Sequence, residues 1–414
     1  MSDVAHRSDR RRLAVVVWAV LVSQVFLYPG VPTLVDALGA PSAGIDAGMW
    51  FLVAEFAAFV AFAGVWGAMS DATGRRVALV VVGAVGGGLT YLAVPALPGL
   101  GVGFGGVLLL RVVGGAFTIG AFSLGITMLM DLRGGHGRNM GAAGIAIGFG
   151  AAVGSVVGGR LADADPFYPL YAGGAVLLGA ALLASTVSDR TEAATAGAGG
   201  AAAAPTDADR PGFREIARRM RAMPGLLVPF AFGFIDRLTA GFFALVGVYY
   251  FQDPAVFGLS AFGAGLTLAL FFLPFALLQY PMGVLSDRIG RFYPVVVGSL
   301  AYGAVIAGVG LAPTYPVAAL LMVLVGVCGA LVAPATMALV TDLVAPSERG
   351  AAMGLFNVFG SLGFLTGFLV GGTVTEGFDY LTAFLVVGGL ELAIAVLLFP
   401  AVRVITAETG PGPS

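Results

Sequence analysis

The stretch Gly67-Ala-Met-Ser-Asp71-Ala-Thr-Gly74-Arg75-Arg76 decides the fold, because a second copy of it follows in the other half of the chain. The copy reads Gly283-Val-Leu-Ser-Asp287-Arg288-Ile-Gly290-Arg291. Glycine, aspartate, glycine and arginine recur at one constant shift (287 − 71 = 216), and each copy lies between two long apolar runs. A chain of 414 residues with such a repeat is predicted to consist of two halves built on one plan.

The composition of the chain indicates a membrane protein. Hydrophobic residues make up 58% of it and charged residues only 11%, which is more apolar side chain than a soluble fold can bury. We therefore predict an all-α membrane protein with twelve transmembrane helices, each formed by an apolar run of about 20 residues or more. The expected spans lie near residues 13–38, 47–69, 77–97, 101–130, 140–161 and 166–187, and near 224–251, 258–285, 292–312, 315–341, 350–373 and 380–401.

The order of these spans predicts the domain organisation. Residues 1–187 are expected to form an N-terminal six-helix bundle, and residues 223–403 a C-terminal six-helix bundle. Residues 188–222 have too little apolar side chain to fold alone, so we expect a cytoplasmic linker. Its last part predicts a short amphipathic helix on the membrane surface, with a solvated run of charge as the alternative. Residues 404–414 are expected to be a cytoplasmic tail.

Arginine placement predicts the orientation of the chain. Alternate loops on one side carry nearly all the arginines outside the spans, whereas only Arg160 lies on the other side. By the positive-inside rule, both termini are cytoplasmic, and we expect a multi-pass protein of the plasma membrane. The run after Arg12 is too long for a signal peptide and is expected to be the first span.

Several classes of function are excluded by what the spans and loops contain. Cys328 is the single cysteine and the two histidines lie outside the spans, so we expect no disulfide, no metal site and no cofactor. All 21 basic residues are arginine, which rules out a Walker motif with its lysine. Nothing supports a nucleic-acid partner. An enzyme or a signalling protein is therefore only a remote alternative.

The doubled motif resembles the signature that joins helices 2 and 3 of the major facilitator superfamily of secondary transporters. The second copy stands where helices 8 and 9 of that family meet. One departure is visible, because the arginine usual after the aspartate is Arg288 in the second copy but Ala72 in the first. The resemblance implies two pseudo-symmetric six-helix bundles around a central cavity, alternating access for a small-molecule substrate, and a monomer.

The repeated loop has a mechanical interpretation as a cytoplasmic gate. Its first glycine should let two helices cross closely, and its second glycine should permit a tight turn. Its aspartate should accept hydrogen bonds from the positive end of a helix that starts nearby. The arginines also enforce the orientation. In the family fold the first aspartate meets the start of helix 11, which here follows Pro346-Ser347-Glu348 as a candidate cap. The gate residues are Gly67, Asp71, Gly74, Arg75, Arg76, Gly283, Asp287, Arg288, Gly290 and Arg291, and Asp131 with Arg138 and Asp342 with Arg349 are expected to add a second symmetric set.

Glycines at four-residue spacing in the fifth span resemble the antiporter signature of the superfamily's drug and metabolite exporters. The proline usual after the second glycine is replaced by Ser155. Plain helix packing is the alternative explanation, since small residues let helices approach closely in lipid. The motif comprises Gly150, Gly154, Ser155, Gly158 and Gly159, and the same steps recur in the eleventh span at Gly363, Gly367, Gly371 and Gly372.

Charged residues within the spans are candidate functional sites, because a charge at membrane depth is costly unless it is paired or hydrated. Asp236 and Arg237 are neighbours in the middle of the seventh span and point about 100° apart, so each needs another partner or water. The resemblance places this helix at the central cavity. Asp236 is interpreted as a proton-coupling or substrate site, with a structural ion pair as the alternative.

A second charged pair is expected between the second and fourth spans. Arg111-Val-Val-Gly-Gly115 resembles the family's Arg-x-x-x-Gly motif, which is associated with proton antiport. Glu55 lies at a matching depth on another inward-running helix and is the natural partner. Such a pair could equally set the register of the helices.

Uncharged polar residues give weaker indications. Gln24 and Tyr28 lie one turn apart before Pro29, which should bend the first span, and Asn357 lies in the eleventh. Glu391 in the twelfth span has no partner that the sequence can name.

The predicted function is a proton-coupled exporter of small apolar or drug-like molecules. The alternative is proton-coupled uptake of an organic anion or a sugar.

Overall fold

The computed structural model of the chain describes residues 2–42, 44–130, 136–187, 223–345 and 348–409, and this part of the chain is helical with no strand. Ten of its helices are long and apolar enough to cross a membrane. The two other expected spans, 140–161 and 166–187, correspond to α6 (His136–Ala164) and the shorter α7 (Tyr168–Ala184). The prediction of an all-α membrane fold is therefore confirmed.

By their contacts, the residues form two compact units, 1–209 with 260–265, and 210–259 with 266–414. The linker expected at 188–222, with its amphipathic helix, lies outside the described residues. The last helix continues to Thr409, past the boundary expected at residue 403.

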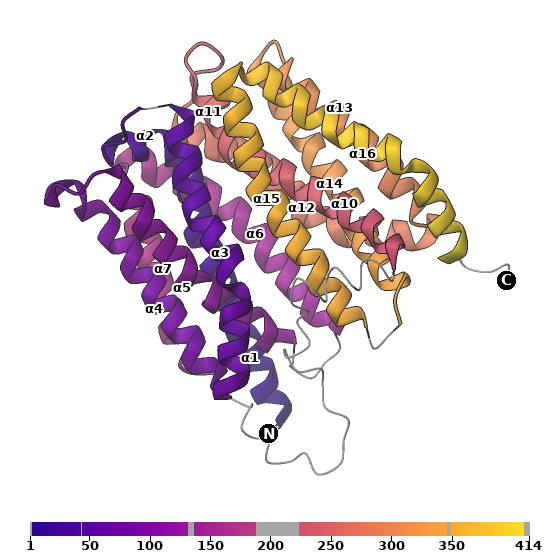
Figure 1. Cartoon of the computed structure of the whole chain (residues 1–414), viewed down its shortest axis with the longest axis horizontal. Coiled ribbons are helices and arrows are strands. Elements are labelled where there is room, and N and C mark those ends of the chain that lie inside the picture. Colours follow the sequence, from indigo (N-terminus) through magenta and orange to yellow (C-terminus); the bar gives the residue numbers. More distant parts are fainter. Residues whose placement is uncertain (1, 43, 131–135, 188–222, 346–347, 410–414) are drawn as a thin grey trace. The chain divides into compact units, whose positions relative to one another are not determined.

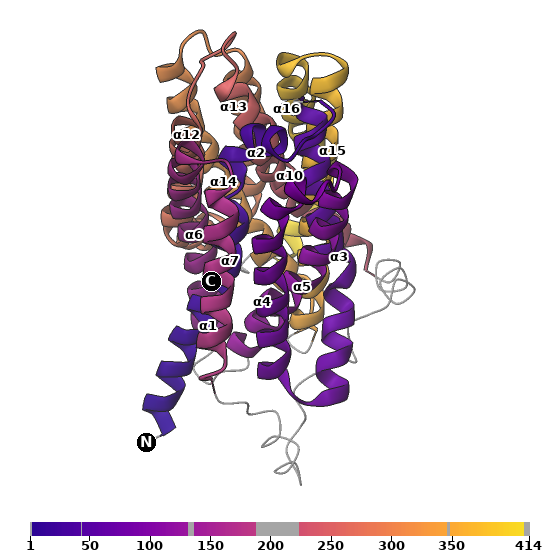
Figure 2. The ribbon, with the colours of Figure 1, turned by 90° about the vertical axis from the view of Figure 1, so that its left-hand side faces the viewer.

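The helices of the N-terminal unit pack side by side along their lengths (Figures 1 and 2). The first span is interrupted at Pro29, where a bend was predicted, since α1 gives way to a 3-10 turn at Tyr28–Gly30 before α2 begins. The bounds are α1 Ser2–Val25, α2 Val31–Ala37, α3 Ile45–Thr73, α4 Arg76–Ala93, α5 Phe104–Met130, α6 and α7.

The C-terminal unit repeats this plan, including an irregular turn in its first span. Five residues, Phe243–Gly247, form a π-helical segment between α10 and α11, and the repeat shift carries Tyr28 into it (28 + 216 = 244). The bounds are α10 Leu227–Phe242, α11 Val248–Gln252, α12 Ala261–Ile289, α13 Phe292–Gly310, α14 Tyr315–Asp342, α15 Arg349–Gly377 and α16 Tyr380–Thr409.

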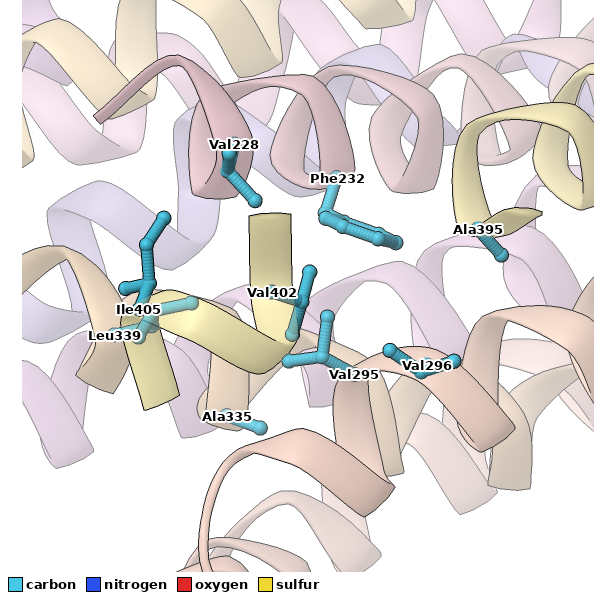
Figure 3. Packing of buried hydrophobic residues seen from close by; sticks show 9 residues of the cluster. All are labelled: Val228, Phe232, Val295, Val296, Ala335, Leu339, Ala395, Val402 and Ile405. Atoms are coloured by element: carbon cyan, nitrogen blue, oxygen red, sulfur yellow. The ribbon is translucent and has the colours of Figure 1, made fainter. Parts of the chain in front are cut away.

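Apolar packing holds four helices of this unit together. Figure 3 shows Val228 and Phe232 of α10 facing Val402 of α16 and Val295 of α13. At the C-terminal end of α10 and in α11, aromatic rings pack on one another, with Phe242 and Tyr250 each in edge contact with Phe384. These rings are buried, so they serve the packing of the unit.

Candidate functional site

A buried ion pair lies inside the N-terminal unit. Arg111 of α5 contacts Glu55 of α3 through its guanidinium, and the two residues are only 2% and 4% exposed. The Tyr91 hydroxyl of α4 donates to the same carboxylate, at 2.9 Å from Oε1 and 3.2 Å from Oε2. A buried charge pair needs such additional hydrogen bonds to offset its desolvation. The carboxylate of Glu55 is therefore well satisfied as an anion.

Aromatic rings enclose the arginine of this pair. The guanidinium carbon of Arg111 lies 4.3 Å from the ring centroid of Phe51 and 5.2 Å from that of Tyr91. These are cation–π distances, which stabilise a cation away from water. Tyr28, in the broken part of the first span, lies within electrostatic range of both Glu55 and Arg111. We call Glu55, Arg111, Tyr91 and Tyr28 the N-terminal charge cluster.

The glycine of the Arg-x-x-x-Gly motif explains how the pair forms. A Cβ built at Gly115 would collide with the backbone carbonyl oxygen of Glu55 and lie 3.1 Å from its Cα. Gly115 follows Arg111 by about one helical turn, so both residues face α3. The glycine thus lets α5 approach α3 at the level where the arginine meets its carboxylate.

The charged neighbours of the seventh span point in different directions, as expected for adjacent residues on a helix. Asp236 of α10 is 6% exposed, whereas the Arg237 side chain is 45% exposed. The Nε atom of Arg237 lies 3.9 Å from Oδ2 of Asp236, at the outer limit of an ion pair. Arg237 lies along α15, where its Cγ is 3.2 Å from a Cβ built at Gly360. Asp236 is therefore a buried carboxylate with only a distant cation.

The repeated loops adopt the predicted tight turns. Gly74 and Gly290 have φ angles of +63° and +84°, which favour glycine, and the Gly74 N–H closes α3 on Ser70 O at 2.9 Å. At Gly283 a Cβ would meet only Pro334 Cβ at 3.7 Å, an ordinary contact, so the close helix crossing expected there is not seen within this unit.

Arginines tie each loop to a neighbouring residue. Arg76 Nε donates to Ser70 Oγ at 3.3 Å, and Arg291 bridges Asp287 at 2.5 Å and Asp342 at 3.2 Å. In the second predicted charge set, Asp342 pairs with Arg291, and Arg349 donates to the Thr341 carbonyl at 3.3 Å.

The structure describes only some residues of the second predicted charge set and of the candidate cap before α15. Glu348 precedes α15 without a side-chain cap hydrogen bond, and Ser347, Asp131 and the side chain of Arg138 lie outside the described residues.

The glycines of the antiporter-like motif pack α6 against α1. A Cβ at Gly158 would collide with the Phe26 carbonyl, one at Gly154 would lie 3.0 Å from Val25 Cβ, and one at Gly150 would lie 3.0 Å from the Trp18 ring. Ser155, in the place of the usual proline, donates to Ala152 O at 3.0 Å. The matching glycines of α15 lie against α10 in the same manner, with Gly363 on Phe234 O.

The two remaining candidates lie in different surroundings. Gln24 is 6% exposed, and its Nε2 has no hydrogen-bond partner among the described residues. Asn357 is exposed on α15. No group of His, Cys, Asp and Glu side chains suited to a metal is found in the described part of the chain.

Tyr91 is the participant that sequence reasoning missed. It lies about six residues before the C-terminal end of the expected span 77–97, and Glu55 lies about eight residues after the N-terminal end of the expected span 47–69. The comparison of depths that paired Glu55 with Arg111 would also have found this phenol.

Comparison with known proteins gives a family match over nearly the whole chain. The profile of the Major Facilitator Superfamily matches residues 13–255 and 234–413. A region of 137 residues is 32% identical to the multi-drug resistance efflux pump PmrA of Streptococcus pneumoniae serotype 4, covering 33% of this chain and 34% of PmrA. Another of 178 residues is 32% identical to the inner membrane transport protein YajR of Escherichia coli K12, covering 41% and 38%. The matches thus span less than half of each relative.

Solved structures share the fold. A bacterial homologue of the human lysosomal transporter Spinster, in an inward-facing and unoccupied conformation, superposes with a TM-score of 0.73 at 17% identity over 99% of both chains. A D-xylose-proton symporter gives a TM-score of 0.72 at 17% identity, covering 94% of this chain and 96% of its own.

Proposed function

The chain belongs to the major facilitator superfamily, and from that premise we propose that it is a proton-coupled exporter of a small, apolar organic solute. As a member of this family it is a multi-pass membrane transporter and not an enzyme. We further propose that it resides in the plasma membrane with both termini in the cytoplasm, works as a monomer, and exchanges protons for substrate by alternating access.

The contrast between two buried acids carries the proposal of proton coupling. Glu55 has a contacting guanidinium and a donating hydroxyl, so its charge is held in place. Asp236 is equally buried, but its nearest cation in the described structure is 3.9 Å away on a half-exposed side chain. A carboxylate that must change charge during transport cannot be locked into a tight ion pair. Asp236 is therefore the coupling carboxylate, and the N-terminal charge cluster sets the register of α3, α4 and α5.

The direction of transport is supported by two observations. The glycine motif of α6 follows the antiporter signature except at Ser155. Among the relatives, PmrA and LfrA of Mycolicibacterium smegmatis are named multidrug efflux pumps. Both favour export.

Uptake of an organic anion by symport is the second candidate, because Arg237 is 45% exposed and could bind a carboxylate. In that case Arg237→Gln would weaken binding of anionic substrates specifically. An exporter of apolar solutes would keep its substrate range in this variant.

Transport in reconstituted vesicles tests the coupling role of Asp236. Asp236→Asn resembles the protonated carboxyl, so it should still exchange substrate in counterflow without a gradient. It should fail to accumulate substrate against a concentration gradient when a pH gradient is imposed. The matched control is Glu376→Gln, which alters an exposed acid at the end of α15 and should leave both activities unchanged.

The outcomes separate the alternatives. If Asp236→Asn loses counterflow and accumulation together, the residue binds substrate or is structural. If it keeps both, the transported proton is carried elsewhere, and Glu55 becomes the next candidate. The direction of proton flow that accompanies substrate movement distinguishes export from uptake.

A further inference from the structure

Glu391 of α16 is a fully buried carboxyl group in the C-terminal unit. It is 0% exposed, and neither Oε1 nor Oε2 has a hydrogen-bond partner among the described residues. An ionised carboxylate in such a place would be uncompensated, which is strongly unfavourable. A neutral, protonated Glu391 would avoid this cost.

Two idle hydroxyl groups lie beside this carboxyl. Ser299 and Tyr302 are about one turn apart on α13, they are both 0% exposed, and neither Oγ of Ser299 nor Oη of Tyr302 has a hydrogen-bond partner in the described chain. Ser299 lies close enough to the Glu391 carboxyl to donate a hydrogen bond to it, although no bond of good geometry is formed, and Tyr302 is within electrostatic range of the same carboxyl. Buried polar atoms without partners are rare in proteins. Four of them in one cluster indicate a site that is completed by a ligand or by a change of protonation.

The cluster reaches the proposed coupling carboxylate. Asp236 lies within electrostatic range of both Tyr302 and Glu391. Asp236, Ser299 and Glu391 each lie four residues, about one helical turn, from a core residue that Figure 3 labels. These core residues are Phe232, Val295 and Ala395, so the polar cluster continues the same helix faces that form the apolar core.

The surrounding helices supply few other ionisable groups. Arg237 of α10 and Cys328 of α14 are the remaining neighbours of Tyr302, and Cys328 also faces Glu391. Between residues 352 and 375, α15 has no ionisable side chain. Among the described residues, the guanidinium of Arg237 is thus the cation close to these two carboxyl groups.

We propose that Glu391, Ser299 and Tyr302 form a buried proton-binding site that exchanges its proton with Asp236. In one state Asp236 is ionised with Arg237 nearby and Glu391 is protonated, which fits the 3.9 Å separation of Arg237 from Asp236 and the missing partners of the Glu391 oxygens. In the other state the proton is on Asp236, and the hydroxyl groups of Ser299 and Tyr302 donate to the ionised Glu391. These two hydroxyl groups, which have no hydrogen-bond partner in the described chain, are the donors that the second state requires.

The exchange is balanced as a simple proton transfer. The O–H bond of the Glu391 carboxyl breaks, an O–H bond forms on the Asp236 carboxylate, and the negative charge moves to Glu391. The Tyr302 hydroxyl can pass the proton by donating to one carboxylate while accepting from the other. This inference rests on the proposed coupling role of Asp236, but the protonation of Glu391 can be tested without transport.

Infrared spectroscopy of the purified full-length chain provides that test. The C=O stretch of protonated carboxyl groups is recorded during a pH titration in the absence of substrate. The wild type should retain a protonated-carboxyl band at pH values where exposed acids are ionised, and Glu391→Gln should remove that band. Glu376→Gln, the control, should leave it unchanged. A band that survives in Glu391→Gln would overturn the proposal.

Transport measurements test the exchange itself. Glu391→Gln, Tyr302→Phe and Ser299→Ala should each slow pH-driven transport, by about ten-fold or more for the first, while counterflow stays within about two-fold of the wild type. Equal loss of both activities in all three variants, or full retention of pH-driven transport, would contradict the exchange. If added Na⁺ at constant pH removes the infrared band, the cluster binds a cation instead. A separate result would contradict the proposed function itself. That result is an Asp236→Asn variant that still couples transport to the pH gradient.

Discussion

Gly115 of α5 lies directly against the backbone carbonyl of Glu55 of α3, one helical turn from the arginine that pairs with that same glutamate. The contact means that a close approach of the two helices and the buried ion pair occur at one level of the bundle. The Arg-x-x-x-Gly spacing thus places the glycine that allows close helix packing one turn from the arginine that forms the ion pair.

Enlarging Gly115 should therefore separate the ion pair. We expect Gly115→Ala to lower the stability of the purified protein by about 1–3 kcal/mol, because the new methyl group meets backbone atoms that have no room to move. Thermal unfolding in detergent measures the change. Gly64→Ala on α3 is the control, since a Cβ at that glycine would meet nothing within 4 Å. Equal losses of stability in the two variants would show that the close contact at Gly115 does not contribute to the stability of the protein.

Breaking the ion pair from either side should cost more than removing it altogether. Glu55→Gln and Arg111→Gln should each destabilise the protein by about 3–5 kcal/mol, because each leaves one charge buried without its partner. The double variant should lose less than the sum of the two. A double-mutant cycle on thermal stability checks this prediction, and strictly additive losses would mean that the pair is energetically uncoupled.

The first gate aspartate should control access and leave the fold intact. We expect Asp71→Asn to insert and fold normally but to transport more slowly, because the cytoplasm-open state becomes more populated. Labelling of single cysteines introduced at the two ends of the helices reports which side is open, in a Cys328→Ala background. The matched variant Asp287→Asn removes the partner of Arg291 in the second loop. Unchanged labelling together with normal transport in Asp71→Asn would refute the gate.

The loop before α16 offers a prediction about pH. Asp379 accepts from the Thr382 backbone N–H at 2.6 Å, and this hydrogen bond lowers the pKa of its carboxyl group. Since the folded pKa lies below the unfolded one, the stabilisation is present above the unfolded value and is lost as the pH falls through the folded value. Asp379→Ala should therefore unfold at a lower temperature than the wild type near neutral pH. The difference should narrow as the pH falls below about 4, the ordinary range of an aspartate. A difference that stays constant across this range would show that the ionised cap contributes nothing.

Much of the architecture follows from local features of the sequence. The length of each apolar run determines a spanning helix, and the repeat of the Gly-x-x-x-Asp-x-x-Gly-Arg stretch determines the two halves. Pro29 interrupts the first span, and Gly74 and Gly290 take the left-handed turns that their positions indicated. These features depend on a residue and its neighbours along the chain, so a linear pattern suffices to predict them.

The partners of the buried polar residues were decided by the tertiary structure. Depth along a span made Glu55 and Arg111 candidates for each other, but the hydroxyl of Tyr91, the choice of Arg291 by Asp342, and the burial of Asp236 beside an exposed Arg237 depend on packing. Glu391 had no partner in the sequence because Ser299 and Tyr302 lie on a helix about ninety residues away. Which side chains meet depends on the rotation of each helix about its own axis. In a lipid bilayer that rotation is set by close packing between helices and not by the pattern within any one of them.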